Sequence, residues 1–163
     1  MPRFESAVDV DVPVRTAYDQ WTQFEQFPRF MDHVEQVEQI DDRTLHWVAR
    51  IAGQRKDWNA EITDQTPDRR VAWRSTSGDQ NDGAVTFDAI DPDRTRVTLR
   101  IDADPTGPVE TTGVALGFLE RAVEGDLKQF KEYIETRRVP SGAWRGEIHG
   151  EEVEPDAAEI RSR

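Results

Sequence analysis

The sequence predicts an α+β fold, in which a curved antiparallel sheet of seven strands wraps around one long helix near the C-terminal end. Seven short segments are predicted as strands, and in six of them apolar and polar residues alternate with the period of two that is typical of half-buried strands. Short turns rich in Gly, Pro and Asp join the last six segments, so neighbouring strands should run antiparallel. Helical spacing of apolar residues follows the first strand and then fills residues 111–138.

One strand and two short helices are predicted at the N-terminal end. Residues 4–12 alternate between mostly apolar and mostly acidic positions, and Pro13 ends this strand because it can begin a helix, where its missing N–H is not needed. The i, i+3, i+4, i+7 spacing of apolar residues in 14–21 predicts an amphipathic helix of about two turns. A second short helix is predicted around 24–27, before Pro28.

Six further strands are predicted from residue 34 onward. In residues 34–40 the apolar side chains are three positions apart, which indicates a β-bulge. Regular alternation then predicts strands around residues 44–51, 57–62, 71–73, 85–87 and 96–103. Residues 75–81 are polar and contain Gly, so we expect an exposed loop there.

The C-terminal third contains the long helix and a segment without periodicity. Residues 111–138 place apolar side chains three or four positions apart and charged ones on the other side. Gly, Pro and Glu become frequent in residues 139–163, which predicts an acidic, largely disordered tail, with Trp144 packing back onto the domain. We therefore expect one domain, residues 1–138, followed by this tail.

Charge and composition exclude several classes of partner and site. The formal net charge is −12, so the chain should repel nucleic-acid phosphates and anionic membrane surfaces. The absence of Cys excludes disulfides, thiol nucleophiles and Cys-ligated metals. No apolar run approaches the ~18 residues of a membrane span, and the first residues lack the apolar region of a signal peptide. We therefore expect a cytoplasmic location, no stable membrane insertion and no nucleic-acid partner. The excess of Arg over Lys, with 33 acidic residues, fits either a salt-rich cytoplasm or a GC-rich genome.

Several segments together resemble a known superfamily. They include VDVPVRTAYDQWTQFEQFPRFM, VEQVEQID, HWVARIAGQRKDWNAEI, PDRRVAWRSTSG, GAVTFDAI, TRVTLRID and DLKQFKEYIETR. From about Arg3 to Arg138, the chain resembles the START-like or SRPBCC superfamily, in the branch of polyketide cyclase/dehydrases that is related to coenzyme Q-binding proteins. The resemblance implies a helix-grip fold, START/Bet v 1-like, with a cavity between the sheet and the last helix.

Carried onto this sequence, the resemblance implies a cavity lining of inward strand positions and positions on the last helix. The alternation of the strands selects the same faces. The alternative is that these side chains simply fill the core. The predicted ligand-binding residues are Trp47, Ala49, Trp58, Ala60, Trp73, Phe87, Leu99, Ile101, Leu116, Leu119, Val123 and Leu127.

Catalytic chemistry finds little support in the sequence. General acid–base catalysis needs a titratable group inside a dry pocket, and the inward strand positions offer almost none. His33 is expected at the surface, with the mouth of the pocket as the alternative; His46 falls on an outward face and His149 in the tail. Tyr18 is expected to pack in the core with its hydroxyl at the surface. We predict no catalytic residue, no metal site and no cofactor, and whether the protein is an enzyme stays open.

The sequence therefore predicts binding of a small hydrophobic ligand that is a lipid, a quinone or polyketide-like. The first alternative is an enzyme of the polyketide cyclase, aromatase or dehydratase class. The second is a protein-interaction or chaperone-like module. Access to the cavity is expected first at residues 52–54 and 75–81, with 27–33 as a third candidate, and the oligomeric state is not predicted.

Overall fold

The fold was obtained as a computed structural model, which describes residues 3–51, 53–78, 80–104 and 112–155. In chain order its elements are β1 (Arg3–Val10), α1 (Val14–Trp21), the 3-10 helix η1 (Phe24–Arg29), β2 (Val34–Gln39), β3 (Thr44–Ile51), β4 (Gln54–Thr66), β5 (Arg70–Gly78), β6 (Gln80–Asp91), β7 (Arg94–Asp104), α2 (Thr112–Arg137), β8 (Glu147–His149) and β9 (Glu152–Glu154).

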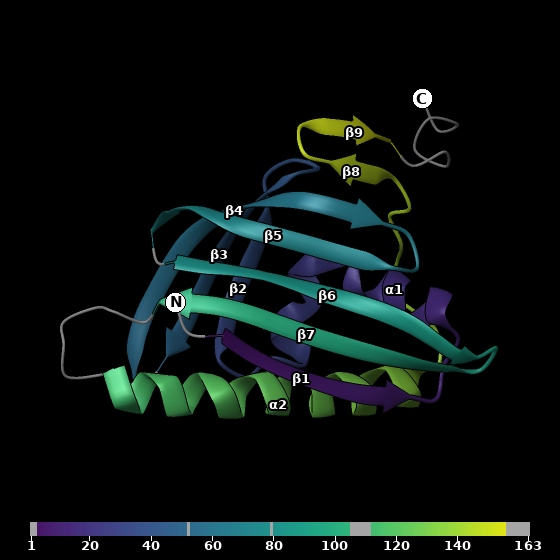
Figure 1. Cartoon of the computed structure of the whole chain (residues 1–163), viewed down its shortest axis with the longest axis horizontal. Helices are drawn as coiled ribbons and strands as arrows, with labels where there is room; N and C mark the ends of the chain where they lie inside the picture. Colours follow the sequence, from purple (N-terminus) through teal and green to yellow (C-terminus); the bar gives the residue numbers. More distant parts are fainter. Residues whose placement is uncertain (1–2, 52, 79, 105–111, 156–163) are drawn as a thin grey trace.

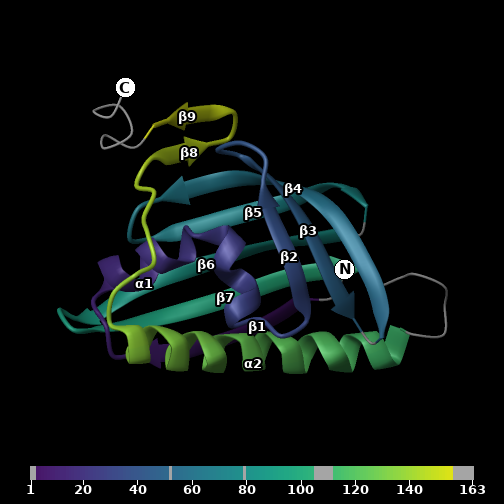
Figure 2. The ribbon, with the colours of Figure 1, turned by 180° about the vertical axis from the view of Figure 1, so that it is seen from behind.

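The main sheet is antiparallel, with the strand order β1-β7-β6-β5-β4-β3-β2. Its concave side faces α2, and α1 and η1 lie at one end between the sheet and the helix (Figures 1 and 2). The first strand pairs with the seventh, so β1 forms one edge of the main sheet and β2 the other. The predicted α+β helix-grip fold is confirmed, including the two short helices between the first two strands.

The strand register explains which side chains point inward. Trp47 of β3 lies opposite Trp58 of β4, and Ile62 of β4 lies opposite Trp73 of β5. Pairing between β2 and β3 shifts after Val34, as the spacing of apolar residues in this strand predicts. The last helix buries Phe130 and other apolar residues of its inner stripe against the sheet and α1. No helix within the described ranges is both long and apolar enough to span a membrane.

The prediction of a loop at residues 75–81 is wrong, although residues 76–78 are exposed as expected. Ser77 and Gly78 still pair with β4, and β6 begins at Gln80, so the two strands continue almost to the turn. The polar side chains themselves stabilise this hairpin, since Asp82 Oδ1 accepts a hydrogen bond of 2.9 Å from the backbone N–H of Ser75. Gly78 takes a positive φ of 81°, which allows the tight reversal.

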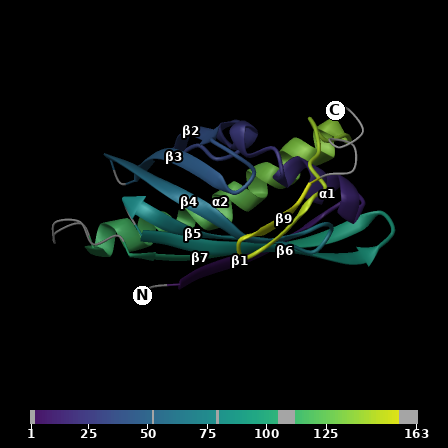
Figure 3. The same ribbon diagram turned by 90° about the horizontal axis from the view of Figure 1, so that it is seen from above.

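The prediction of a disordered tail is wrong for residues 139–155. This segment runs from the end of α2 past α1 (Figure 3), and its two short strands extend the sheet beside the end of β4. β8 pairs with β4, where Ile148 is opposite Gln65 and is fully buried, and β9 pairs with β8. The sheet therefore has nine strands rather than seven. Trp144 packs against the core as expected, and residues 156–163 lie outside the described residues.

Candidate functional site

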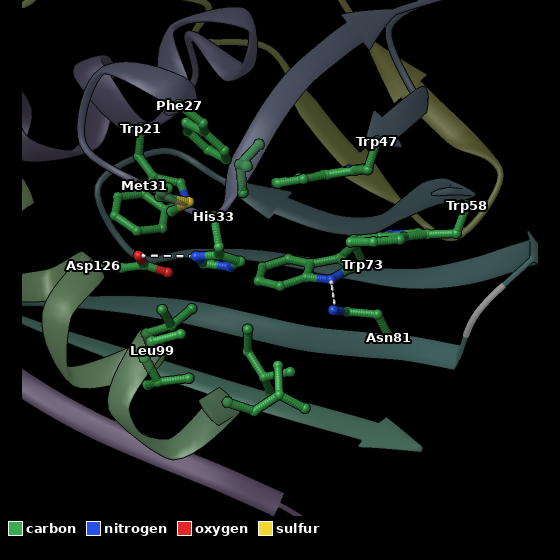
Figure 4. A pocket seen from close by; sticks show the side chains of 15 residues that line it. Trp21, Phe27, Met31, His33, Trp47, Trp58, Trp73, Asn81, Leu99 and Asp126 are labelled. Atoms are coloured by element: carbon green, nitrogen blue, oxygen red, sulfur yellow. Dashed lines mark hydrogen bonds and ion pairs between the residues drawn. The ribbon is translucent and has the colours of Figure 1, made fainter. Parts of the chain in front are cut away.

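A narrow cavity lies between the concave face of the sheet and α2 (Figure 4). Strands β2 to β7 all contribute to its wall, together with α1, η1 and the inner face of α2. Its volume is about 40 Å³, room for only a few water molecules. The lining consists of Trp21, Phe27, Met31, His33, Val34, Trp47, Trp58, Trp73, Asn81, Leu99, Ile101, Leu119, Ala122, Val123 and Asp126.

The structure brings many of the predicted lining residues together at this cavity. They are Trp47, Trp58, Trp73, Leu99, Ile101, Leu119 and Val123. Ala49, Ala60, Phe87 and Leu127 are buried but do not line it. The Phe87 ring instead packs edge-on against Tyr18 at 5.5 Å, near α1. The side chain of Leu116 lies outside the described part of the structure. That the lining residues bind a ligand stays a prediction.

Aromatic rings form one side of the cavity. The indoles of Trp47 and Trp58 are stacked, with centroids 5.8 Å apart and planes 7° apart. This pairing follows from the register of β3 and β4, which places the two residues directly opposite each other. Phe27 of η1 continues the wall, 5.4 Å from Trp47. Rings that pack on one another in this way give the cavity a flat apolar surface.

A titratable pair closes the other end of the cavity. His33 Nδ1 lies 3.5 Å from Asp126 Oδ1, and the two side chains are only 15% and 7% exposed (Figure 4). Asp126 projects from α2, while the backbone carbonyl of His33 accepts a 2.8 Å hydrogen bond from the N–H of Arg50 in β3. Burial raises the pKa of the Asp126 carboxyl, and the neighbouring His33 lowers it in part. A largely buried His–Asp pair of this kind offers the side chains that general acid–base chemistry uses.

The expected surface position of His33 is therefore wrong, and Asp126 was missed. A signal for Asp126 exists in the sequence, since it lies seven positions after Leu119 and three after Val123, on the same helical stripe. A carboxylate among the apolar residues of an inner helix face is unusual, because Asp is seldom buried without a partner. No comparable local pattern places His33, because its position depends on a hydrogen bond to β3.

The other titratable candidates lie outside this cavity. His46 is on β3 with Nδ1 2.6 Å from Asn59 Oδ1, and His149 is exposed beside Glu147. The expectation of a surface hydroxyl on Tyr18 is wrong, because the whole side chain is buried and the ring of Tyr18 lies 5.5 Å from the guanidinium carbon of Arg145. Burial raises the pKa of this hydroxyl. Tyr18 belongs to the packing around α1 rather than to the cavity lining.

Comparison with known proteins gives a consistent assignment. A sequence model of the family described as polyketide cyclase / dehydrase and lipid transport matches residues 10–132. An uncharacterized 17.2 kDa protein from the melC2-rnhH intergenic region of Streptomyces lincolnensis is 47% identical over 149 residues, covering 91% of this chain and 99% of that protein.

Solved structures share the fold. The Zhui aromatase/cyclase from Streptomyces sp. R1128 superimposes with a TM-score of 0.73 at 17% identity, over 87% of this chain and 98% of that chain. A START superfamily protein from Mycobacterium smegmatis gives a TM-score of 0.65 at 14% identity, over 83% of this chain and 95% of that chain. Identities this low show a common fold alone. The family match confirms the resemblance seen in the sequence and spans most of the chain, which therefore belongs to the polyketide cyclase/dehydrase and lipid transport family, with a START-like fold.

Proposed function

We propose that this protein binds a small, mostly apolar molecule in the cavity between the sheet and α2. The observation that carries the proposal is the gathering of Trp47, Trp58 and Trp73 from three neighbouring strands on one wall. Large aromatic side chains with few polar groups are typical of small-molecule sites. The description of the family, which names both polyketide chemistry and lipid transport, supports the same class of ligand.

The cavity must widen to accept such a ligand. Sites for small molecules commonly measure ~300–1,000 Å³, far more than the about 40 Å³ present here. The segment 27–33 is the best supported of the three predicted routes of access, because Phe27, Met31 and His33 all line the cavity. Met31 has an unbranched, flexible side chain that can change rotamer at low cost. We expect this segment to move when the ligand enters.

An enzyme of the cyclase, aromatase or dehydratase class is the second candidate. The specific observation that favours it is the His33–Asp126 pair, which places a proton acceptor and its carboxylate partner inside an apolar cavity. Removal of a proton next to a carbonyl group, followed by ring closure and loss of water, needs a base of this kind. A simple probe is heptane-2,6-dione, whose cyclisation to a conjugated cyclohexenone can be followed by absorbance.

That probe separates the two candidates. A catalyst should accelerate the cyclisation over buffer, and His33→Gln should remove the acceleration while the fold is retained. If the native protein leaves the rate unchanged yet binds apolar ligands, the binding role stands alone.

The interaction-module alternative receives less support. In the part of the chain that the structure describes, the exposed large apolar side chains are Ile40, Ile90 and Val139. Ile40 follows β2, Ile90 lies in β6 and Val139 follows α2, so the three side chains belong to three different parts of the chain. Large docking surfaces usually expose contiguous apolar area. The cytoplasmic location and the relation to coenzyme Q-binding proteins stay predictions.

Ligand titration tests the proposed function directly. Palmitic acid, 1,4-naphthoquinone and phenanthrene should be titrated into the purified chain by calorimetry, with tryptophan fluorescence as a second readout. Ala122→Leu fills the cavity and should weaken binding by roughly tenfold or more, whereas Ala89→Leu at an exposed position of β6 should not. The proposal fails if none of the three probes binds the native protein.

A further inference from the structure

Three tryptophans line the cavity, and their indole N–H groups differ in their partners. Trp73 Nε1 donates a hydrogen bond to Asn81 Oδ1 at 3.3 Å. The Nε1 atoms of Trp47 and Trp58 are buried, and neither has an acceptor among the protein groups in the described ranges. The two side chains are only 8% and 5% exposed. The same type of donor is thus satisfied on β5 and unsatisfied on β3 and β4.

A buried donor without an acceptor lowers stability, because the hydrogen bond that it made to water in the unfolded chain is not replaced. Such groups are few in native proteins, and each one needs an explanation. Trp47 and Trp58 are also neighbours, with nearly parallel rings 5.8 Å apart. The two donors therefore belong to neighbouring side chains that line the same cavity.

We propose that the ligand is a planar ring compound with neutral oxygen acceptors, such as ketone or quinone carbonyls, which accept hydrogen bonds from Trp47 Nε1 and Trp58 Nε1. This inference rests on the proposed function, that the cavity binds a small apolar molecule. A planar ring matches the flat indole wall, and its carbonyl oxygens satisfy the buried donors. The hydrocarbon part of an acyl chain has no acceptor for these donors.

The other end of the cavity favours a neutral acceptor over a carboxylate. Asp126 and His33 lie there, on the other side of the cavity from the stacked indoles of Trp47 and Trp58 (Figure 4). Asp126 already brings a carboxyl group into an apolar site, and a second carboxylate nearby would add both repulsion and desolvation. A carbonyl oxygen accepts the same indole hydrogen bonds without that cost.

Two probes of similar shape test the inference: 1,4-naphthoquinone, which carries two carbonyl oxygens, and naphthalene, which carries none. The chain has no Cys, so the quinone cannot form thiol adducts. Their affinities are measured by calorimetry on the full chain, native and with benzothienylalanine at position 47 or 58. This residue keeps the shape of indole but has sulfur in place of the N–H. Each replacement should lower the ratio of quinone to naphthalene affinity about three- to tenfold.

Position 73 supplies the matched control, because the N–H of Trp73 is already bonded to Asn81. The same replacement there should leave the affinity ratio within about twofold of native, as expected for a donor that the ligand does not use. If the replacements at 47 and 58 also leave the ratio unchanged, the indole donors do not select the ligand, and the inference is overturned. Binding of palmitic acid alone would overturn the inference but keep the proposed function, and no binding at all would overturn both.

Discussion

The Trp73 ring lies directly against Gly83 of β6, its partner across the strand pair. A Cβ atom at position 83 would stand 2.5 Å from Trp73 Cζ2 and 2.6 Å from the backbone oxygen of Arg100. No side chain fits in this space. Because residue 83 is glycine, the indole of Trp73 can pack directly on the backbone of β6 and is not pushed toward the cavity. The cavity wall therefore depends on a residue that does not line it.

Gly83→Ala should push the Trp73 indole toward the cavity and strain the pairing with β7. We expect a loss of about 1–3 kcal/mol in the free energy of unfolding, typical of overpacking, and weaker ligand binding. Urea unfolding and calorimetry measure the two effects. Gly125→Ala in α2 is the control, since a Cβ there meets nothing within 4 Å and Ala favours the helix by about 1 kcal/mol. Equal stability of the two variants would contradict the role of Gly83.

Arg145 should hold the C-terminal segment on the domain. Its guanidinium binds Asp19 at 2.5 Å and Asp68 at 2.8 Å, and Asp19 is only 5% exposed. Arg145→Ala leaves that carboxylate buried without its closest partner, so we expect a loss of about 3 kcal/mol in urea unfolding. Limited proteolysis should then cut within residues 139–155 faster than in the native chain.

Arg15 provides a control on the same carboxylate. It lies 3.7 Å from Asp19, but its side chain is 71% exposed, so water screens the interaction. Arg15→Ala should change the free energy of unfolding by less than ~0.5 kcal/mol. If it destabilised the protein as much as Arg145→Ala, then general charge balance rather than the buried contact would explain the effect.

The inner face of α2 should tolerate no charge. Val123 is 2% exposed and lines the cavity, whereas Glu120 is exposed on the other side of the helix. Val123→Asp should cost several kcal/mol, on the order of 3 or more, because an unpaired carboxylate is buried. Glu120→Ala should change stability by less than ~0.5 kcal/mol. Thermal unfolding of both variants checks the assignment, and similar melting temperatures would show that the helix face is wrong.

The elements with strong periodicity could be predicted from the sequence. Alternation alone places Trp47 and Trp58 on the same face of neighbouring strands, and helical spacing gives α2 to within a residue at its C-terminal end. The ends of the strands were harder to predict from the sequence. For example, β4 covers residues 54–66, but its alternation of apolar and polar residues is clear only over 57–62. The extra residues are polar, and among them Gln65 is buried against β8, so they show no alternation of apolar and polar side chains.

Long-range contacts account for what the sequence did not predict. Arg145 reads as part of a polar, Gly-containing segment, yet it binds Asp19 and Asp68 more than 70 positions away. The place of His33 in the cavity depends on β3 in the same way. Neither contact leaves a periodic pattern, because each involves one side chain rather than a face.

Asp126 should make stability fall as pH rises. Burial raises the pKa of its carboxyl in the folded protein, so above the unfolded pKa of about 3.9 the folded state retains the proton longer than the unfolded state does. Stability is therefore fully present below that pH and decreases as pH rises through the folded pKa. Asp126→Asn cannot ionise, so the decrease should be smaller in urea unfolding between pH 4 and 7.

Asp41 is a control of the opposite sign. A backbone hydrogen bond from Arg43, together with bonds from Thr44, lowers the pKa of the Asp41 carboxyl. Its contribution to stability is present above the unfolded pKa and is lost as pH falls, so Asp41→Asn should weaken the protein at neutral pH and matter little near pH 3. The two variants should thus diverge in opposite directions from the native pH profile. Parallel profiles for Asp126→Asn and the native chain would show that the Asp126 carboxyl is not held in an unfavourable, desolvated position beside His33.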